Sequence, residues 1–423
     1  MTQDSKRILF SFPTDWDRKQ LPLCRTVRDG RVEPVYGEPA HGWHDWDMDI
    51  LAYLEEQCRQ YRGKLAGVLS TSDYPGASVA AVLARRLGLP GPDPEVVLRL
   101  GHKYLSRVLQ KEVVPEAAPD FWLVDPDGAP PEDIRYPCFL KPVKGAFSVH
   151  TGKIGGAAEL ESFLRRQAIG TFRRQTMAIF NTLVGEVGSL AHDGSKFIAE
   201  GLLSGVQVTV EGWVQGGNPR IFGIVDSVVD PATGSFIRFD YPSSLSILVQ
   251  RRMRDIAKRL IRGSTLDDTV FNIEMFYEQA TDTVSIIEVN PRLCGQFADL
   301  YQKVDGTSSY NVAMNVALGR KPRFDRGDGP FELAASVPLR IFRPSRVVFA
   351  PDDDAVDRIA KAHPGTLIWS EVETGMALTD FETYEDGKSA RFAVINLGAA
   401  SRSGLLDKVE ALHRELGFVF EEV

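Results

Sequence analysis

The chain has 423 residues, of which 43% are hydrophobic and 25% charged, the composition of a globular protein too long for a single hydrophobic core. Its formal net charge of −8 argues against nucleic acid as the main partner, and no apolar run reaches the roughly 18–20 residues of a membrane span. The apolar run near the N-terminus is too short for a signal peptide, so a cytoplasmic enzyme is expected.

Four cysteines are scattered along the chain without a CxxC pair or a nearby group of histidines: Cys24, Cys58, Cys138 and Cys294. This spacing indicates reduced structural thiols rather than a zinc or redox site. Cys294 has no local base in the sequence, so it is not expected to act as a nucleophile.

Residues 1–94 alternate between strand and helix patterns. Strands are predicted over residues 6–12 and 64–69, and helices over residues 46–62 and 77–87, with Gly88 ending the second helix. A polar loop over residues 70–76 joins the second strand to its helix. The alternation predicts a small parallel α/β domain of Rossmann-like type, although no GxGxxG follows its first strand to support a dinucleotide site.

Lysines mark the next segment. A helix predicted over residues 93–111 carries Lys103, and residues 114–131 are expected to be mostly connection. A strand pattern then ends in Lys141 and continues into a glycine-containing loop with Lys144 and Ser148. A lysine on a buried strand is costly unless an anion meets it, and the amides of such a loop can cradle phosphate oxygens. From these residues alone, a phosphate loop and a surface loop remain equal alternatives.

Residues 197–213 predict two strands and a short connector, with Glu200 near the end of the first strand and Gln207 in the second. The chain crossing there could offer backbone groups to an adenine edge and Gln207 to a ribose, but taken alone both are plain surface residues. Residues 222–242, which include Asp226, predict a strand and a charged loop that could close over a substrate.

The basic run over residues 251–263 has one apolar face at helical spacing. This pattern favours a packed amphipathic helix over a nucleic-acid patch.

Residues 271–296 predict a β-hairpin, because two runs alternate apolar and polar residues around a short polar turn. A turn centred near residue 281 places Glu274 opposite Glu288, with Cβ atoms about 4.5–5.5 Å apart. Two like charges so placed repel unless a cation lies between them, and Mg²⁺ takes one or two carboxylates and leaves other positions to water and phosphates. Asn290 offers a third oxygen and Arg292 a fixed cation. The alternative is an amphipathic hairpin with a solvated acidic face.

Residues 331–423 begin with a strand pattern and end with a helix predicted over residues 405–416. The mixture predicts a third, capping domain of α+β character.

The order of these features resembles the ATP-grasp superfamily of carboxylate-amine ligases, and most of all its L-amino acid ligases and biotin-carboxylase-like enzymes. The lysines, Glu200, Glu274 and the motif Glu288-x-Asn290-x-Arg292 carry the resemblance, which covers nearly all of the chain. It implies an α/β and α+β architecture: an N-terminal domain over residues 1–94, an ATP-grasp domain over residues 95–330 with a small lid at about 136–200, and a C-terminal cap over residues 331–423.

The resemblance also implies roles for individual residues. ATP would be bound by Lys103, Lys141, Lys144, Ser148, Glu200, Gly201, Leu202, Leu203 and Gln207, with Gln207 where many relatives have a glutamate. One or two Mg²⁺ ions, with Mn²⁺ as an alternative metal, would be bound by Glu274, Glu288 and Asn290. Arg292 would be catalytic and would neutralise the acyl phosphate. The substrate-binding residues would be Asp226, Arg292, Gly295 and Gln296.

The activity that the resemblance implies is ATP-dependent formation of an amide, between amino acids, through an acyl phosphate with release of ADP and phosphate. The partners would be small-molecule carboxylates and amines, without nucleic acid or membrane, and a homodimer is the implied assembly. Two alternatives remain open: carboxylation or phosphoryl transfer at the same site, and a nucleotide sensor without turnover. The sequence does not name the substrates, because fold does not fix them.

Overall fold

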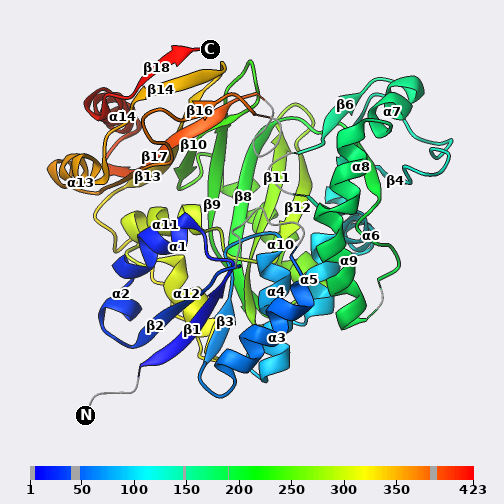
Figure 1. Cartoon of the computed structure of the whole chain (residues 1–423), viewed down its shortest axis with the longest axis horizontal. Coiled ribbons are helices and arrows are strands. Elements are labelled where there is room, and N and C mark those ends of the chain that lie inside the picture. The colour runs from blue at the N-terminus through cyan, green and yellow to red at the C-terminus, as the bar shows by residue number, and fades with distance from the viewer. Residues whose placement is uncertain (1–4, 40–47, 146–148, 189, 382–387) are drawn as a thin grey trace.

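The computed structural model describes residues 5–39, 48–145, 149–188, 190–381 and 388–423, and within these ranges the strands form four sheets (Figure 1). An eight-stranded sheet runs through the middle of the molecule. The N-terminal sheet and its helices lie below the long strands in the view of Figure 1, and a lobe containing α7 to α9 lies to one side.

The N-terminal sheet is parallel throughout, with strand order β2-β1-β3, as the alternating pattern predicts. Its strands are β1 (Lys6–Ser11), β2 (Val32–Gly37) and β3 (Gly67–Leu69), and its helices are α1 (Asp15–Gln20), α2 (Arg25–Arg28), α3 (Ile50–Tyr61) and α4 (Gly76–Leu87). Gly88 ends α4 at φ 67°, the left-handed conformation that favours glycine, which confirms the predicted helix end. The sequence analysis missed β2, a six-residue strand that contains Pro34.

The single helix predicted over residues 93–111 is wrong: the structure has two helices, α5 (Pro94–Gly101) and α6 (Lys103–Val113). His102 between them is extended, and its imidazole accepts a hydrogen bond from the amide of Leu105, so it caps α6. Burial lowers the pKa of His102 to about 4, which keeps the ring neutral and able to accept. The break places Lys103 in the first turn of α6.

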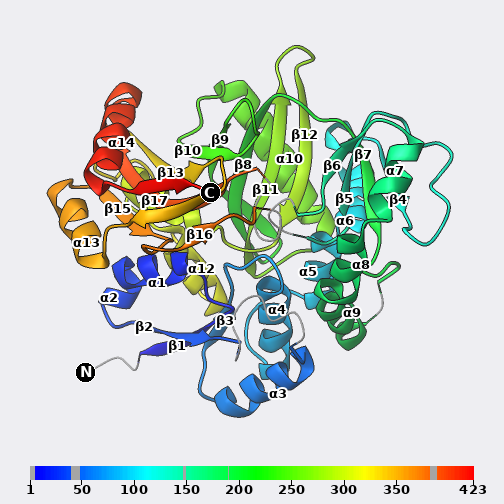
Figure 2. The same cartoon turned by 45° about the horizontal axis from the view of Figure 1, so that its top comes forward.

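The side lobe is an antiparallel sheet of order β4-β7-β5-β6 with helices packed on it (Figure 2). Its strands are β4 (Phe121–Val124), β5 (Cys138–Pro142), β6 (Gly152–Ile154) and β7 (Phe197–Gly201), and its helices are α7 (Ala157–Leu164), α8 (Gln167–Arg174) and α9 (Thr176–Val187). Strand β4 lies in the segment predicted to be mostly connection, and it corrects that prediction. Its role is to cover the free edge of β7.

The eight-stranded sheet has the order β12-β11-β8-β9-β10-β13-β17-β15. Its first five strands are β8 (Val206–Gln215), β9 (Asn218–Val229), β10 (Phe236–Tyr241), β11 (Thr269–Glu278) and β12 (Thr283–Asn290). Helix α10 (Ile247–Ser264) packs its apolar side chains, among them Met253 and Leu260, against this part of the sheet, which confirms the amphipathic helix predicted for the basic run. Helices α11 (Ala298–Asp305) and α12 (Ser309–Ala317) follow the hairpin.

The C-terminal segment mixes helices and strands, as predicted. Strands β13 (Leu333–Ile341), β15 (Thr366–Ser370) and β17 (Ala390–Ala399) extend the eight-stranded sheet, because β13 pairs with β10. A second sheet and two helices cover them: β14 (Ser345–Phe349), β16 (Ala377–Leu378), β18 (Val419–Glu422), α13 (Asp353–Ala362) and α14 (Arg402–Leu416). One sheet thus crosses the boundary expected at residues 330–331, and the division into three domains stays a prediction.

No helix within the described ranges combines the length and the apolar character that a membrane crossing requires.

A close contact between β3 and α12 gives a stability prediction. A Cβ atom on Gly67 would lie 2.6 Å from the carbonyl oxygen of Ala317, whereas Gly185, exposed within α9, has no neighbour within 4 Å of such an atom. We expect Gly67→Ala to destabilise the protein by about 1–3 kcal/mol, because the obstacle is backbone. Gly185→Ala is the matched control and should stabilise it by roughly 0.5–1 kcal/mol. Urea unfolding measures both, and a Gly67→Ala variant as stable as wild type would contradict the packing described.

Candidate active site

The hairpin of β11 and β12 places two carboxylates directly opposite each other. Glu274 pairs with Glu288 and Asn272 with Asn290, so the register predicted from the sequence is confirmed. The amide nitrogen of Asn290 donates to Asn272 at 2.9 Å and to Glu288 at 3.4 Å. These four side chains lie on the sheet face opposite α10, because side chains on a strand alternate between faces.

A bulge follows the carboxylate pair. The register shifts between Glu274 and Met275, so Ile287 has no partner residue on β11. Its carbonyl oxygen instead accepts hydrogen bonds from Arg107, at 2.7 Å, and from Lys141, at 3.5 Å. The irregular strand thus ties the hairpin to helix α6 and to strand β5.

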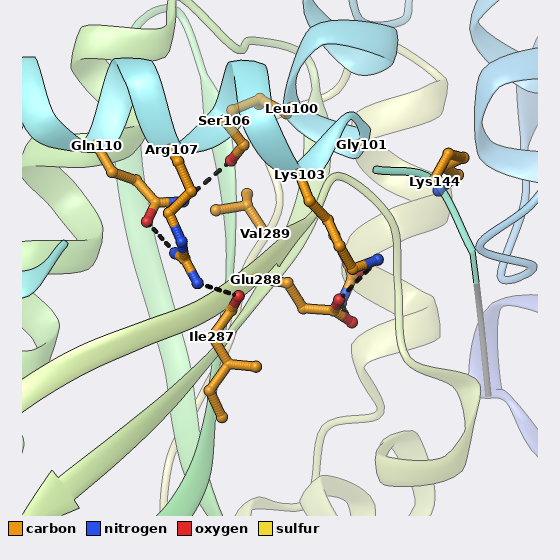
Figure 3. Close-up of a pocket in the computed structure, with 11 residues that line it drawn as sticks. Leu100, Gly101, Lys103, Ser106, Arg107, Gln110, Lys144, Ile287, Glu288 and Val289 are labelled. Atoms are coloured by element: carbon orange, nitrogen blue, oxygen red, sulfur yellow. Dashed lines mark hydrogen bonds and ion pairs between the residues drawn. The ribbon is translucent and has the colours of Figure 1, made fainter. Parts of the chain in front are cut away.

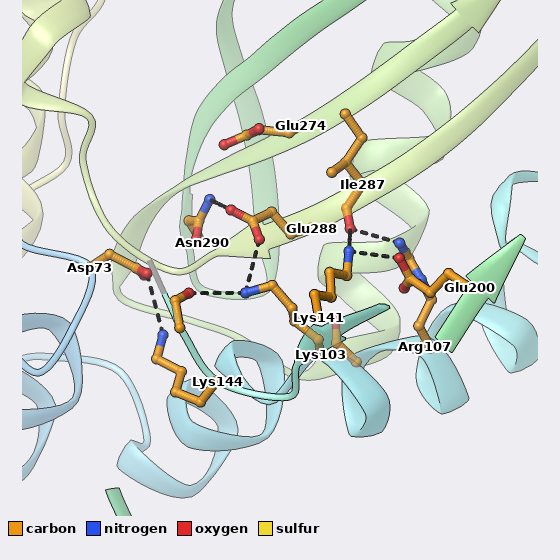
Figure 4. A network of polar contacts seen from close by, with 12 residues as sticks. Asp73, Lys103, Arg107, Lys141, Lys144, Glu200, Glu274, Ile287, Glu288 and Asn290 are labelled. Atoms are coloured by element: carbon orange, nitrogen blue, oxygen red, sulfur yellow. Dashed lines mark hydrogen bonds and ion pairs between the residues drawn. The ribbon is translucent and has the colours of Figure 1, made fainter. Parts of the chain in front are cut away.

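Lysines from two elements meet Glu288 and its surroundings (Figure 4). Lys103 Nζ lies 3.1 Å from Glu288 and also donates to the carbonyl oxygen of Gly145 at 3.1 Å. Lys141 Nζ lies 2.6 Å from Glu200. Burial acts to lower the pKa of both lysines. For Lys103 the carboxylates of Glu288, Asp73 and Glu200 together outweigh burial and raise the pKa, whereas for Lys141 burial prevails and the pKa is lowered.

Arg107 is a site residue that the sequence analysis missed. It is 1% exposed, and its Nε donates to Glu200 at 2.7 Å while its guanidinium also contacts Gln110. Burial would raise the pKa of Glu200, but Arg107 and Lys141 outweigh it and lower the pKa. The signal was present: Lys103, Arg107 and Gln110 recur at helical spacing and form a polar stripe on α6.

The ion pairs of Glu200 bear on its expected role. Its carboxylate, predicted to bind ATP, already pairs with Arg107 and Lys141. Gly201 ends β7, and Leu202 beyond it is 42% exposed; Leu203 continues the same connection to β8. Adenine binding by the connector between β7 and β8 stays a prediction.

A loop of the N-terminal unit reaches the same place. Asp73, which follows β3, lies 3.4 Å from Lys144 Nζ and 3.9 Å from Arg292 Nε. Burial alone would lower the pKa of Arg292, but Asp73 and the neighbouring carboxylates raise it. The sequence offered no signal for Asp73 beyond a polar loop, because its partners lie far away along the chain.

The electrostatics of the carboxylate pair are strongly asymmetric. Burial, and then the charge of Glu288, raises the pKa of Glu274. Burial would also raise the pKa of Glu288, but Lys103 and Lys141 outweigh it and lower the pKa. Gln207, expected at a ribose, donates to Glu274 at 3.0 Å. A second cation near Glu274 would therefore relieve the repulsion that remains.

The residues present fit Mg²⁺. Two opposed carboxylates and the Asn290 amide are the hard oxygen donors that this ion prefers. In the described ranges no group of three or more His, Cys, Asp or Glu residues is placed to hold a metal ion. An ion here would therefore take its remaining ligands from Asn290, water or phosphate oxygens, which is the usual arrangement for Mg²⁺ with a nucleotide.

A small hollow adjoins this cluster, between α6 and the end of β12 (Figure 3). It is lined by Leu100, Gly101, Lys103, Ser106, Arg107, Gln110, Lys144, Ile287, Glu288, Val289 and Asn290. Lys103 and Glu288 point toward each other across it.

Asp226, a predicted substrate residue, lies apart from the cluster around Glu274 and Glu288. Asp226 pairs across the sheet with Val208, which packs in the core beneath α10, so its side chain lies on the face opposite Glu274. There Asp226 accepts hydrogen bonds from the amide and the hydroxyl of Ser244, at 2.7 and 2.6 Å. Asp226 thus fixes the turn before α10 and lies apart from the carboxylate pair, and its contact with a substrate stays a prediction.

Gly295 and Gln296 follow Arg292 directly and stay candidates for substrate contact. The carbonyl oxygen of Gly295 accepts from Gln20 at 2.8 Å, and Gln296 donates to Ser336 at 3.1 Å. Ser148, predicted to bind phosphate, lies outside the described residues.

A third buried carboxylate lies on the same sheet face. Glu211 pairs with Asn272, is 0% exposed, and accepts hydrogen bonds from Tyr301 at 2.9 Å and from the amide of Cys294 at 3.2 Å. Burial raises its pKa to about 7. The sequence analysis missed it, although Gln207 and Glu211 share a face through the strand period of two.

The comparisons with known proteins agree with this architecture. The model of the ATP-grasp domain family matches residues 134–299. No curated protein sequence matches the chain. Residues 134–299 are therefore an ATP-grasp domain.

Solved structures match the entire chain. The L-amino acid ligase from Bacillus licheniformis is 15% identical, with a TM-score of 0.75 and 100% of both chains covered. Phosphoribosylglycinamide synthetase from Anaerococcus prevotii is 14% identical, with a TM-score of 0.65, over 99% of this chain and 100% of the other. The biotin carboxylase domain dimer of the Hydrogenobacter thermophilus 2-oxoglutarate carboxylase, in complex with MgADP, ADP and bicarbonate, is 13% identical, with a TM-score of 0.66, over 100% and 92%. The whole chain thus has the ATP-grasp fold, which confirms the predicted fold.

Glu211 gives a pH prediction. A rise in pKa from 4.5 to about 7 means that the folded state binds the Glu211 proton more tightly than the unfolded state. Wild type should therefore lose stability relative to Glu211→Gln as the pH rises from about 4.5 to 7, by up to about 3 kcal/mol, and no further above 7. Urea unfolding of both proteins at pH 5 and pH 8 measures the difference. If the difference in unfolding free energy between wild type and Glu211→Gln is the same at pH 5 and pH 8, Glu211 is ionised at both pH values.

Proposed function

We propose that this protein is an ATP-dependent carboxylate-amine ligase that joins two amino acids through an acyl phosphate, releasing ADP and phosphate. The observation that carries the proposal is the pair of opposed carboxylates, Glu274 and Glu288, with Lys103 paired to Glu288. Two further cations, Lys144 and Arg292, meet at Asp73 beside this pair. Cations around a metal-binding carboxylate pair suit the transfer of a phosphoryl group, where catalysis is mainly positioning and charge stabilisation.

The lysines hold the phosphates of ATP in this proposal. Lys103 and Lys141 are fixed by Glu288 and Glu200, so they present their charges without reorganisation when the nucleotide binds. Glu274, Glu288 and Asn290 would hold Mg²⁺, which would supply positive charge beside the phosphates. We propose Mg²⁺ rather than Mn²⁺, since Mg²⁺ with ADP is present in the carboxylase domain of the same fold.

Arg292 acts at the acyl group. A carboxylate is a poor electrophile at neutral pH, and its phosphorylation supplies a leaving group for the attacking amine. Negative charge develops on the former carboxylate oxygen during that attack. The Arg292 guanidinium, one residue beyond Pro291 at the end of β12 and 16% exposed, is a rigid donor for this charge.

The L-amino acid ligase from Bacillus licheniformis has the same fold over the full length of both chains. This likeness supports amino acids as the substrates of the present protein. The homodimer and the cytoplasmic location are further expectations, and oligomeric state is tested by sedimentation.

The direct test is phosphate release from ATP and Mg²⁺ across amino acids singly and in pairs, with bicarbonate as a further acid and hydroxylamine to trap acyl phosphates. A ligase gives carboxylate-dependent release and a hydroxamate, and release with bicarbonate alone would indicate a carboxylase instead. ATP binding without release under any condition would overturn the proposal in favour of a sensor.

Removing one metal-binding charge should stop turnover. We expect Glu288→Gln to abolish phosphate release while leaving the fold intact, because the variant removes one of the two negative charges that attract Mg²⁺ and breaks the ion pair with Lys103. Glu278→Gln, at the half-buried far end of β11, is the matched control and should keep wild-type rates. Wild-type turnover in Glu288→Gln would refute the metal assignment.

Arg292→Ala should lower the rate of amide formation by about 10²–10³-fold, the usual cost of losing one transition-state donor. Arg252→Ala removes an exposed arginine that pairs with Asp282, and it should leave the rate unchanged. The measurement is the steady-state rate of the amide product at saturating ATP. An unchanged rate in Arg292→Ala would assign the residue to structure alone.

A further inference from the structure

An unassigned carboxylate lies among the cations of the candidate site. Asp73 contacts Lys144 at 3.4 Å (Figure 4). It also lies 3.9 Å from Arg292, and its side chain is 16% exposed. It belongs to the loop after β3, outside the matched ATP-grasp domain of residues 134–299. The N-terminal unit therefore contributes its own charged group to the site.

A carboxylate at this position works against phosphate binding. Lys144 is one of the lysines that the resemblance assigns to ATP, and Arg292 is the cation that the proposed function assigns to the acyl group; Asp73 competes for both of them. The negative charges of Asp73 and of a phosphate bound beside it would repel each other unless a cation lay between them. The position of Asp73 is thus explained if a positively charged substrate group arrives together with the phosphate.

An aromatic face lies beside one of the same cations. The ring of Tyr74 lies 5.4 Å from Lys144 Nζ, a distance at which an aromatic face attracts a cation. An ammonium group has three donors and no acceptor, so a carboxylate with an aromatic face nearby suits it.

We propose that Asp73 binds the ammonium group of the amine substrate beside Arg292. The assignment rests on the proposed function and refines it: the amine is one that is protonated in solution, such as the α-amino group of an amino acid. When Lys144 and Arg292 turn to the phosphorylated acid, Asp73 pairs with the ammonium in their place, so the site stays balanced in charge. The ammonium transfers one proton to the Asp73 carboxylate, and the nitrogen lone pair so freed attacks the acyl phosphate, with phosphate as the leaving group. The N-terminal unit thereby recognises the amine, and the ATP-grasp domain activates the acid.

The experiment compares two nucleophiles on the same acid. With ATP, Mg²⁺ and the accepted carboxylate, kcat/KM is measured for an amino acid amine and for hydroxylamine, which is largely uncharged near neutral pH. In Asp73→Asn we expect the loss for the amino acid to exceed the loss for hydroxylamine by about 10- to 100-fold, mostly in KM. Asp73→Glu keeps the charge and should recover part of the loss. Asp29→Asn, which removes a surface carboxylate paired with Arg31, should change neither value.

Two results would overturn the assignment. Equal losses for both nucleophiles would mean that Asp73 acts only through Lys144 and Arg292, and no loss for either would mean that it has no role. Thermal unfolding of each variant shows that it is folded. A wild-type protein that forms neither hydroxamate nor amide with any carboxylate would instead refute the proposed function, and the assignment of Asp73 with it.

Discussion

The repulsion between Glu274 and Glu288 is the constraint on which the rest of the site depends. The two carboxylates lie directly opposite each other on neighbouring strands, and Lys103 reaches Glu288 from another element. Leaving a buried charge uncompensated costs several kcal/mol, so the surrounding elements must supply cations and donors. The burial of Glu274 beside an ionised Glu288 leaves a demand for one more positive charge.

The fold meets this demand by bringing together segments that are distant in sequence. Helix α6 supplies Lys103 and Arg107, strand β5 supplies Lys141, and the end of β12 leads to Arg292. The bulge at Ile287 turns one carbonyl oxygen toward Arg107 and Lys141, which fixes the hairpin relative to the side lobe. Because each cation already has a protein partner, the charges are in place before any ligand arrives.

Features that follow from local pattern could be predicted from the sequence, and features that follow from tertiary contact could not. The register of Glu274 and Glu288 follows from alternation on both sides of a short turn. Arg107 was missed because its partners Glu200 and Ile287 lie 93 and 180 residues away along the chain. Asp73 needs knowledge of how the N-terminal loop packs against Lys144. The sheet face of Asp226 could not be predicted because its strand is buried on both faces, so alternation does not separate a site face from a core face.

The most direct test of this account is calorimetric binding of ATP with and without Mg²⁺ to wild type and to Glu274→Gln. The account predicts that Mg²⁺ strengthens ATP binding to wild type by about tenfold or more, because nucleotide and metal share the carboxylate pair, and that the gain is lost in the variant. ATP binding that is equally tight with and without Mg²⁺, or a gain that survives in Glu274→Gln, would contradict it.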